Sequence, residues 1–489
     1  MIKRNPFLSS LSVLLLALGA AAGCSDDPAG TGGAGASGGA GGAGGSGGAG
    51  GGAELQNIYD VARSLDDYSS LVAAVDKAGL ADALKDSSAS LTVFAPDNDA
   101  FAALLSAVGA SSLDDLSAEQ LRPILLYHVL GTEVDAEAAT AAAQSNTKVD
   151  GLGGGIQLSL DGMTIRLDDT ASVEVADVQA SNGVIHGIDA VILPSITDVV
   201  VSDTRFSSLA TALGVADQDP SDPGLVAALD DNAATFTAFA PTDDAFAALV
   251  SALSASPSTG ITGLGDFAGY QLIPVLKYHV VAGAAVRAAE VSDGPITTLG
   301  GQVVASTGSG VTIDAASVTI ADILTKNGVI HVVDGVLLPS ITDVVTTAPE
   351  LSALAGAVIA ADGDGATSPK VAPALDAAAA SGAYTLFAPD NAAFAALGQA
   401  PSGQALTNVL LYHVLNQSTA VYAADALGLN SPTPFDTLLS GGQITVSTDG
   451  SQVIIDDSGS QVDATVGAPN YFTENGVIHV IDKVLLPAG

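Results

Sequence analysis

Histidine is the residue in this sequence best suited to acid–base or metal chemistry, and its spacing is regular. Of the six histidines, three end the pentapeptide Asn-Gly-Val-Ile-His and three sit in the tripeptide Tyr-His-Val. The first set is His186, His331 and His479, and the second is His128, His279 and His413. Zinc sites need three or four N, S or O ligands, and usually some of these ligands lie close together in the sequence. Here the two histidines of each copy are 58, 52 and 66 residues apart.

No serine stands at a matched position beside these histidines in all three copies, as repeated Ser-His-Asp sites would need. We therefore predict no enzyme, no cofactor and no metal site at the histidines. The alternative is a packed scaffold used three times, and we predict it for His186, His331 and His479.

Two acidic insertions leave calcium open as an alternative. They are "VADQDPSDPG" from Val215 and "AADGDGATSP" from Ala360. Carboxylates in these insertions could gather oxygen ligands for calcium, although neither copy completes an EF-hand loop. The competing interpretation is a solvated loop rich in turn-forming residues. The carboxylates concerned are those of Asp217, Asp219, Asp222, Asp362 and Asp364.

The histidine motifs belong to a longer unit that is written three times. Its openings begin at Ile58, Ile196 and Ile341, with separations of 138 and 145 residues. That spacing is the size of a domain and far exceeds a solenoid repeat. We predict three tandem domains with almost no linker, covering residues 54–194, 195–339 and 340–489.

Each unit contains local patterns typical of defined elements. "FAPDNDAF" predicts a strand that turns into a helix capped by Asp97, with Thr242 and Asp390 as the equivalent caps. Ser117 and Gln120 have the spacing of a capping box, which starts a helix ending near Tyr127. Asn-Gly is a two-residue hairpin signal. The strand after it is apolar on both faces, so its histidine is expected to be neutral and hydrogen-bonded.

The blocks "VFAPDNDAF", "AFAPTDDAF" and "LFAPDNAAF", with the three "NGVIH" ends, resemble the fasciclin domain. The resemblance covers residues 54–489. It implies an α+β fold, a β-sandwich wedge flanked by small helices. It also implies an extracellular, non-enzymatic protein used in cell adhesion and matrix contact. The Tyr-His stretch linked to partner binding in animal members matches Tyr127, His128, Tyr278, His279, Tyr412 and His413.

The N-terminus reads as an export signal. Lys3 and Arg4 precede the short apolar run "VLLLALGAAAG", which ends at Cys24, the only cysteine. This pattern resembles a bacterial lipobox and predicts a signal peptide over 1–23 and a lipidated Cys24. The Gly/Ala/Ser-rich remainder of 24–53 has almost nothing to bury and predicts a flexible tether. An ordinary secretory signal and an uncleaved anchor helix are the alternatives.

Composition narrows the partners. The chain carries 53 Asp plus Glu against 14 Lys plus Arg, a net charge of −39, which opposes binding to nucleic acid or to an anionic lipid surface. We predict a lipid-anchored surface protein, in the outer membrane or at the cell surface, that binds a matrix or cell-surface protein or polysaccharide. An envelope-organising lipoprotein without adhesion is the alternative. A sugar- or lipid-binding receptor is a third, although this Trp-free sequence offers few aromatic platforms.

Overall fold

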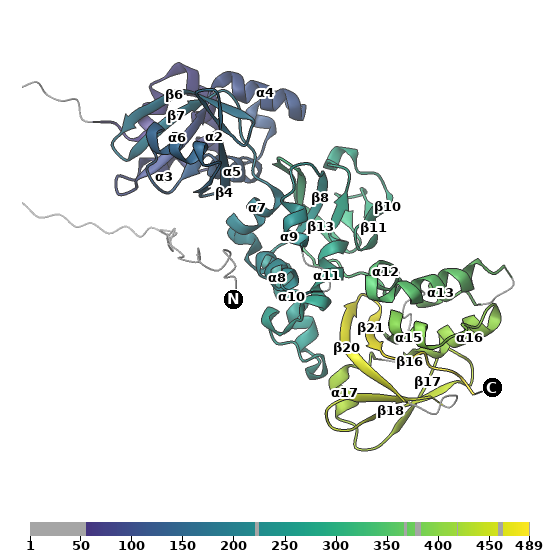
Figure 1. The fold of residues 1–489 in the computed structure, drawn as a ribbon. Coiled ribbons are helices and arrows are strands. Elements are labelled where there is room, and N and C mark those ends of the chain that lie inside the picture. The colour runs from purple at the N-terminus through teal and green to yellow at the C-terminus, as the bar shows by residue number, and fades with distance from the viewer. Residues whose placement is uncertain are drawn as a thin grey trace, which may run out of the picture. The chain divides into compact units, whose positions relative to one another are not determined.

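The computed structural model describes residues 55–220, 224–365, 369–376, 383–417, 419–457 and 463–488. The predicted signal peptide, the lipidated Cys24 and the tether lie outside these residues. Residues 54–489 form one compact unit, in which helices and strands alternate along the chain (Figure 1). We refer to 54–194, 195–339 and 340–489 as domains 1, 2 and 3.

Domain 1 closes seven strands into a barrel, in the order β1-β2-β3-β4-β5-β6-β7. The strands are β1 (Leu91–Pro96), β2 (Val129–Leu130), β3 (Lys148–Gly151), β4 (Gly154–Asp161), β5 (Thr164–Leu167), β6 (Ala171–Ala180) and β7 (Gly183–Ile188). The helices are α1 (Ile58–Arg63), α2 (Ser69–Lys77), α3 (Ala81–Lys85), α4 (Asn98–Val108), α5 (Ala118–Tyr127) and α6 (Ala136–Gln144), with the 3-10 turns η2 (Asp66–Tyr68) and η3 (Leu113–Asp115).

Domain 2 has a seven-stranded sheet in the order β10-β11-β12-β13-β14-β8-β9. Its strands are β8 (Phe236–Pro241), β9 (Val280–Ala282), β10 (Gly294–Thr298), β11 (Gly301–Ser306), β12 (Thr312–Ile313), β13 (Ala316–Thr325) and β14 (Gly328–Val333). Its helices are α7 (Ile196–Ser202), α8 (Ser207–Asp217), α9 (Leu225–Leu229), α10 (Asp243–Ser254) and α11 (Gly269–Tyr278), with η4 (Thr204–Phe206), η5 (Pro257–Thr259), η6 (Leu264–Asp266) and η7 (Ala288–Glu290).

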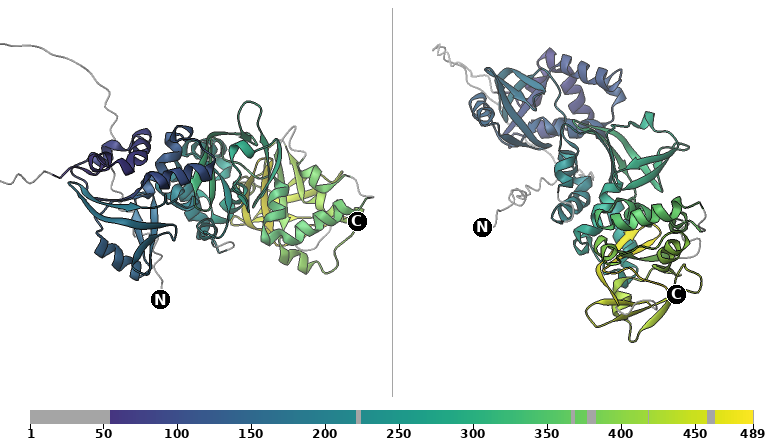
Figure 2. Two further views of the ribbon diagram at one scale, coloured as in Figure 1. Left: turned by 90° about the horizontal axis from the view of Figure 1, so that it is seen from above. Right: turned by 45° about the vertical axis from the view of Figure 1, so that its right-hand side comes forward.

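Domain 3 repeats this sheet in the order β16-β15-β21-β20-β19-β18-β17. Its strands are β15 (Ala383–Pro389), β16 (Val414–Gln417), β17 (Thr433–Asp436), β18 (Gln443–Thr448), β19 (Val453–Asp456), β20 (Ala464–Thr473) and β21 (Gly476–Ile481). Its helices are α12 (Ile341–Thr347), α13 (Ser352–Gly363), α14 (Val371–Asp376), α15 (Asn391–Ala396), α16 (Gln404–Tyr412) and α17 (Ala423–Leu427), with η8 (Pro349–Leu351). The predicted α+β class is confirmed in all three domains, and Figure 2 shows helices beside strands in each.

Each domain has two apolar cores because its central pair of strands is covered on both faces. In domain 1, β1 and β7 pair in parallel. Val93 and Ile185 belong to the core beneath the helices, while Phe94 and Ile188 belong to the core among the strands. All six residues of β7 are buried. The prediction of a strand covered on both faces is therefore confirmed, as expected for parallel pairing.

The strand-to-helix corner and the capping box form as predicted. The carboxylate of Asp97 accepts the backbone N–H of Ala100 at 2.7 Å, and Thr242 and Asp390 cap their helices in the same way. The backbone N–H of Ser117 donates to the side-chain oxygen of Gln120 at 2.7 Å. The backbone N–H of Gln120 donates to the hydroxyl of Ser117 at 3.2 Å.

The Asn-Gly hairpin forms, but its turn begins one residue earlier than the dipeptide suggests. Ala180 pairs with Gly183, so the two turn residues are Ser181 and Asn182. Gly183 is the first strand residue, with φ of 142°, and a Cβ there would lie 1.9 Å from the carbonyl oxygen of Leu91. Glycine is therefore required by the close approach of strand β1.

The asparagine of this hairpin fastens the start of the domain to its end. The side-chain oxygen of Asn182 accepts the N–H of Ile58 at 2.9 Å, and its amide donates to the carbonyl of Leu84 at 2.9 Å. Asn327 and Asn475 make the equivalent bonds in domains 2 and 3. The motif thus holds helices α1 and α3 against the closing strand.

Among the described residues, no single helix has the length and apolar character of a membrane span. One pair, Ile341–Thr347 with Pro349–Gly363, meets those criteria only when taken together, and it is bent by 89°.

Candidate functional site

The three Tyr-His pairs lie inside their domains, where helices α5, α11 and α16 end. All six side chains are at most 3% exposed. They are Tyr127, His128, Tyr278, His279, Tyr412 and His413. A partner cannot touch these side chains while the domain is folded, so the partner contact expected from the resemblance conflicts with their burial.

The histidines of these pairs are neutral bridges between two backbone segments. In domain 1, Nδ1 of His128 lies 2.7 Å from the carbonyl oxygen of Ile124, and the N–H of Ile192 donates to Nε2 at 3.1 Å. A carbonyl accepts and an amide donates, so the ring carries its hydrogen on Nδ1. His279 and His413 repeat both bonds. Burial lowers the pKa of all three to about 4.

The histidines of the pentapeptide carry the hydrogen on the other ring nitrogen. Nε2 of His186 donates to the carbonyl of Val134 at 2.8 Å, and Nδ1 accepts the N–H of Asp177 at 3.3 Å. His331 and His479 do the same. Burial lowers the pKa of His331, and lowers that of His479 to about 4. The expected hydrogen bonds are confirmed at both ring nitrogens of all three histidines, and an Nδ1 that accepts an N–H is the pattern of a neutral ring.

The acidic insertions are partly engaged in helix capping. The carboxylate of Asp362 accepts the N–H groups of Val371 and Ala372, at 2.5 and 2.9 Å, and so caps α14. Asp217 accepts the N–H of Gly224 at 3.2 Å. Asp222 lies outside the described residues. Within the described ranges, no three His, Cys, Asp or Glu side chains are grouped to hold a metal ion.

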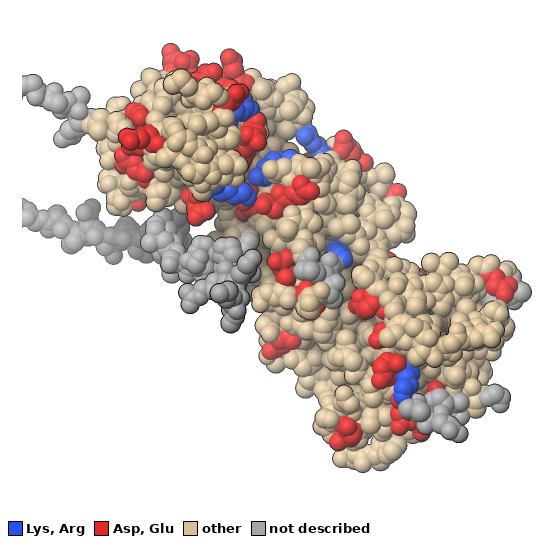
Figure 3. Space-filling model, in the orientation of Figure 1, with Lys and Arg blue, Asp and Glu red and all other residues tan. Residues whose placement is uncertain are grey.

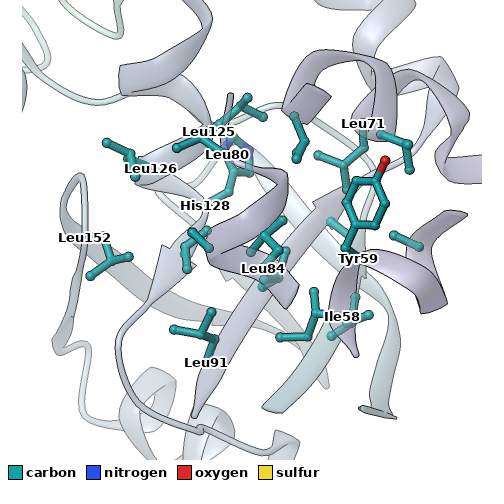
Figure 4. A pocket seen from close by; sticks show the side chains of 18 residues that line it. Ile58, Tyr59, Leu71, Leu80, Leu84, Leu91, Leu125, Leu126, His128 and Leu152 are labelled. Atoms are coloured by element: carbon teal, nitrogen blue, oxygen red, sulfur yellow. The ribbon is translucent and has the colours of Figure 1, made fainter. Parts of the chain in front are cut away.

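An apolar cavity of about 60 Å³ lies in domain 1, lined by residues of helices α1, α2, α3 and α5 and strand β1 (Figure 4). Its wall includes Ile58, Leu71 and Leu84, and its histidine, His128, has both ring nitrogens bonded. A cavity with such a wall stays dry and cannot orient a polar ligand. Phe236 and Tyr384 replace its Leu91 in the other two domains.

The contacts between domains were not found from the sequence. Leu324 of β13 is 7% exposed and belongs to the core of domain 1, and Phe472 of β20 is 5% exposed and belongs to the core of domain 2. The phenyl rings of Phe472 and Phe267 are 5.7 Å apart, edge to face. Each side chain therefore acts as an apolar plug inserted into the preceding domain. The matching residue of domain 1, Gln179, is exposed.

A glutamine from the preceding domain adds a hydrogen bond to each contact. The side-chain amide of Gln120 donates to the carbonyl of Ala321 at 2.9 Å, and that of Gln271 donates to the carbonyl of Asn470 at 2.9 Å. Both carbonyls belong to bulges in the strands that carry the plugs. The sequence carried a signal for these contacts in the differences between the aligned copies. The plug position holds Gln179, Leu324 and Phe472 in domains 1, 2 and 3, and the glutamine position holds Gln120, Gln271 and Ala405.

The charges on the surface are mostly acidic. Figure 3 shows Asp and Glu side chains scattered over the visible face and few basic ones. The described exposed large apolar side chains include Met163, Val201 and Ile359, which come from different domains. This surface offers acidic groups rather than a basic patch for partners.

Comparison with known proteins agrees with the repeated architecture. The fasciclin domain matches residues 66–194, 205–339 and 366–487. Protein sll1483 of Synechocystis is 41% identical over 143 residues, 28% of this chain and 73% of that protein. Human periostin is 25% identical over 452 residues, 88% of this chain, and the chain spans 47% of periostin's length.

Among solved structures, a domain pair from the insect cell adhesion molecule Fasciclin I matches with a TM-score of 0.27 and 17% identity, over 56% of this chain and 94% of that one. The three matches to the fasciclin domain cover well over half of the sequence. The chain therefore belongs to the fasciclin domain family, as three tandem copies.

Proposed function

We propose that this protein is an exported, lipid-anchored surface protein that mediates adhesion or matrix contact through its three fasciclin domains. The observation that carries the proposal is the threefold match to a domain family associated with adhesion. The apolar N-terminal run ending at Cys24 supports export and anchoring. Within this proposal the fasciclin part has no catalytic role, and the membrane is reached only through the lipid.

The partner we propose is a matrix or cell-surface protein or polysaccharide. A net charge of −39 disfavours nucleic acid and anionic lipid. Because the Tyr-His pairs are buried, the binding surface would be made of exposed side chains elsewhere on the domains. Three linked modules would gain avidity when they engage one surface together.

The first test is binding of the labelled full-length protein, with Cys24→Ser to prevent lipidation, to cells that lack it. Saturable binding that unlabelled protein competes away is the expected result. A folded protein that does not bind would contradict adhesion and favour the envelope-organising alternative. Protease treatment of intact cells adds an independent readout, because an adhesive protein must be cleaved from the outside.

A test of avidity that compares fragments with the whole chain must first make the cut surfaces polar. Cutting between domains would expose Leu324 or Phe472, which are buried against the preceding domain. Exposed apolar plugs would create non-specific binding. Fragments should therefore carry Leu324→Gln or Phe472→Gln, which copy the exposed Gln179 of domain 1.

A further inference from the structure

Two residues in the wall of the domain 1 cavity are smaller than their counterparts in the other domains. Ala62 of helix α1 lines the cavity. Each domain has an isoleucine whose N–H donates to the hairpin asparagine, and the residue four positions later is Ala62 in domain 1 but Val200 and Val345 in domains 2 and 3. Both valines are at most 2% exposed. Leu91 is likewise replaced by larger aromatic residues in the other domains. At these two positions, domain 1 therefore fills its core with less side-chain volume.

The side chains of the wall offer no hydrogen bond to a ligand. His128 already uses both ring nitrogens. Tyr59 contributes its ring to the wall, but its hydroxyl donates to the carboxylate of Asp76 at 2.8 Å, and Nζ of Lys85 lies 4.1 Å from the ring centre. The other side chains that line the cavity are aliphatic. A ligand must therefore keep its polar atoms outside the cavity, because a buried polar group without a partner is unfavourable.

Three leucines connect the cavity with the surface. Leu152 lies in the turn between β3 and β4 and is 48% exposed, and its backbone N–H donates to the carbonyl of Val129 at 2.7 Å. Leu91 and Leu126 are half-buried. All three leucines line the cavity, and Figure 4 shows Leu126 and Leu152 on the side away from Tyr59. They form an apolar mouth through which a chain can pass while its polar end stays in water.

The size of the cavity matches a narrow ligand. One water-sized group needs about 10–15 Å³ of such space, so a cavity of about 60 Å³ has room for about four to six of them. A methylene group is close to water in size, so this room corresponds to a short stretch of alkyl chain. Dry apolar cavities in proteins do bind small apolar molecules.

We propose that domain 1 binds the end of an unbranched alkyl chain in this cavity, such as the chain of a fatty acid or of a neutral amphiphile. The chain end lies between Leu71 and Leu84, and the head group stays in water beyond the leucines of the mouth. Removal of the chain from water supplies the affinity, because the wall has no polar group to contribute. The proposal does not depend on adhesion, since it requires no second surface.

The experiment is methyl NMR of the full chain carrying Cys24→Ser, titrated with butan-1-ol and with hexan-1-ol. Each methylene group moved from water into the cavity should tighten binding about fourfold, so hexan-1-ol should bind about 15-fold more tightly than butan-1-ol. The methyl resonances of Leu71 and Leu84 report on the wall. Butanoate and hexanoate form a second arm with a charged head group, which distinguishes a fatty acid from a neutral amphiphile. Tighter binding of the longer chain in either arm is the expected result.

A variant that copies the other domains tests the location. Ala62→Val introduces the valine found in domains 2 and 3. It should weaken the binding of hexan-1-ol about 15-fold, because its two additional methyl groups take the room of about two methylene groups. Val200→Ala makes the reverse change at the matching position of domain 2. As the control, it should leave the shifts of Leu71 and Leu84 as they are in the wild type.

Three outcomes would overturn the proposal. They are the absence of shifts at Leu71 and Leu84 in both arms, equal binding of the shorter and longer chains, and wild-type binding by a folded Ala62→Val variant. Equal binding would mean contact with the surface rather than entry into the cavity. If Ala62→Val does not fold, Leu91→Phe replaces it, because it copies Phe236 and should obstruct the mouth and weaken binding in the same way.

Discussion

The two junctions between domains share one apolar plug and one glutamine hydrogen bond, and they differ in their other contacts. Each inserts one apolar side chain, Leu324 or Phe472, into the core of the preceding domain, and each uses one glutamine amide to bond a bulge carbonyl. The first junction then adds a hydrogen bond from the guanidinium of Arg287 to the carbonyl of Val108, and the second adds a contact between the rings of Tyr270 and Tyr471. The comparison teaches that the repeat supplies a common docking scheme, to which each junction adds contacts of its own.

The ends of the array extend this comparison. The plug position of domain 1 is Gln179, and the glutamine position of domain 3 is Ala405, and both are exposed. The plugs are therefore buried, and the glutamines buried or half-buried, at the two contacts between described domains, while the equivalent positions Gln179 and Ala405 are exposed.

Acidification has the largest expected effect and gives the background against which the junctions are compared. Four buried histidines, His128, His279, His413 and His479, have pKa values near 4. Unfolded histidine titrates near 6.5, so their stabilising effect is complete above that pH and is lost as pH falls toward 4. We expect the melting temperature to fall over this range, with a loss in every domain. A melting temperature that stays constant between about pH 6.5 and 4.5 would contradict the neutral rings.

Removal of the larger plug has the next largest effect. Phe472→Ala should cost about 3–5 kcal/mol, because it removes a buried aromatic side chain and leaves a cavity. Denaturant unfolding of the full chain measures this loss. Gln179→Ala, at the matching exposed position, should change the free energy of unfolding by less than about 0.5 kcal/mol. Equal effects from the two variants would show that the plug contributes nothing to docking.

The two glutamines sharpen the comparison further. Gln271 is 7% exposed and Gln120 is half-buried, so Gln271→Ala should be the more destabilising. We expect about 1–3 kcal/mol for Gln271→Ala, because the carbonyl of Asn470 loses its donor where water reaches poorly. The matching substitution in domain 3, Ala405→Gln, should be close to neutral. If Gln120→Ala destabilised the protein more than Gln271→Ala, the expectation that the more buried glutamine contributes more would be wrong.

The smallest effect is expected at the outermost lysine of the first junction. Lys148 and Asp230 form an exposed ion pair, and such pairs contribute less than about 1 kcal/mol. Lys148→Ala should therefore leave the melting temperature nearly unchanged. In high salt, which screens the pair, even the small difference from the wild type should disappear. A large destabilisation would mean that the pair of Lys148 and Asp230 contributes more to docking than an exposed ion pair can.

Much of each domain could be predicted because the relevant signals are local. Asp97 caps its helix through the amide of Ala100, three residues away, and Ser117 and Gln120 form their box within one turn. The Asn-Gly dipeptide predicted a hairpin, but its turn is offset by one residue. The reason is that Gly183 is needed for contact with β1, more than 80 residues earlier in the chain, rather than for the turn.

The sequence by itself determined the threefold repeat, the α+β class and the neutral histidines, because periodicity, capping and apolar patterning are written in neighbouring residues. Only the tertiary structure decided that the Tyr-His pairs are buried and that Leu324 and Phe472 lie in the core of another domain. Burial depends on residues far apart in the chain, and no local pattern specifies which of them will meet.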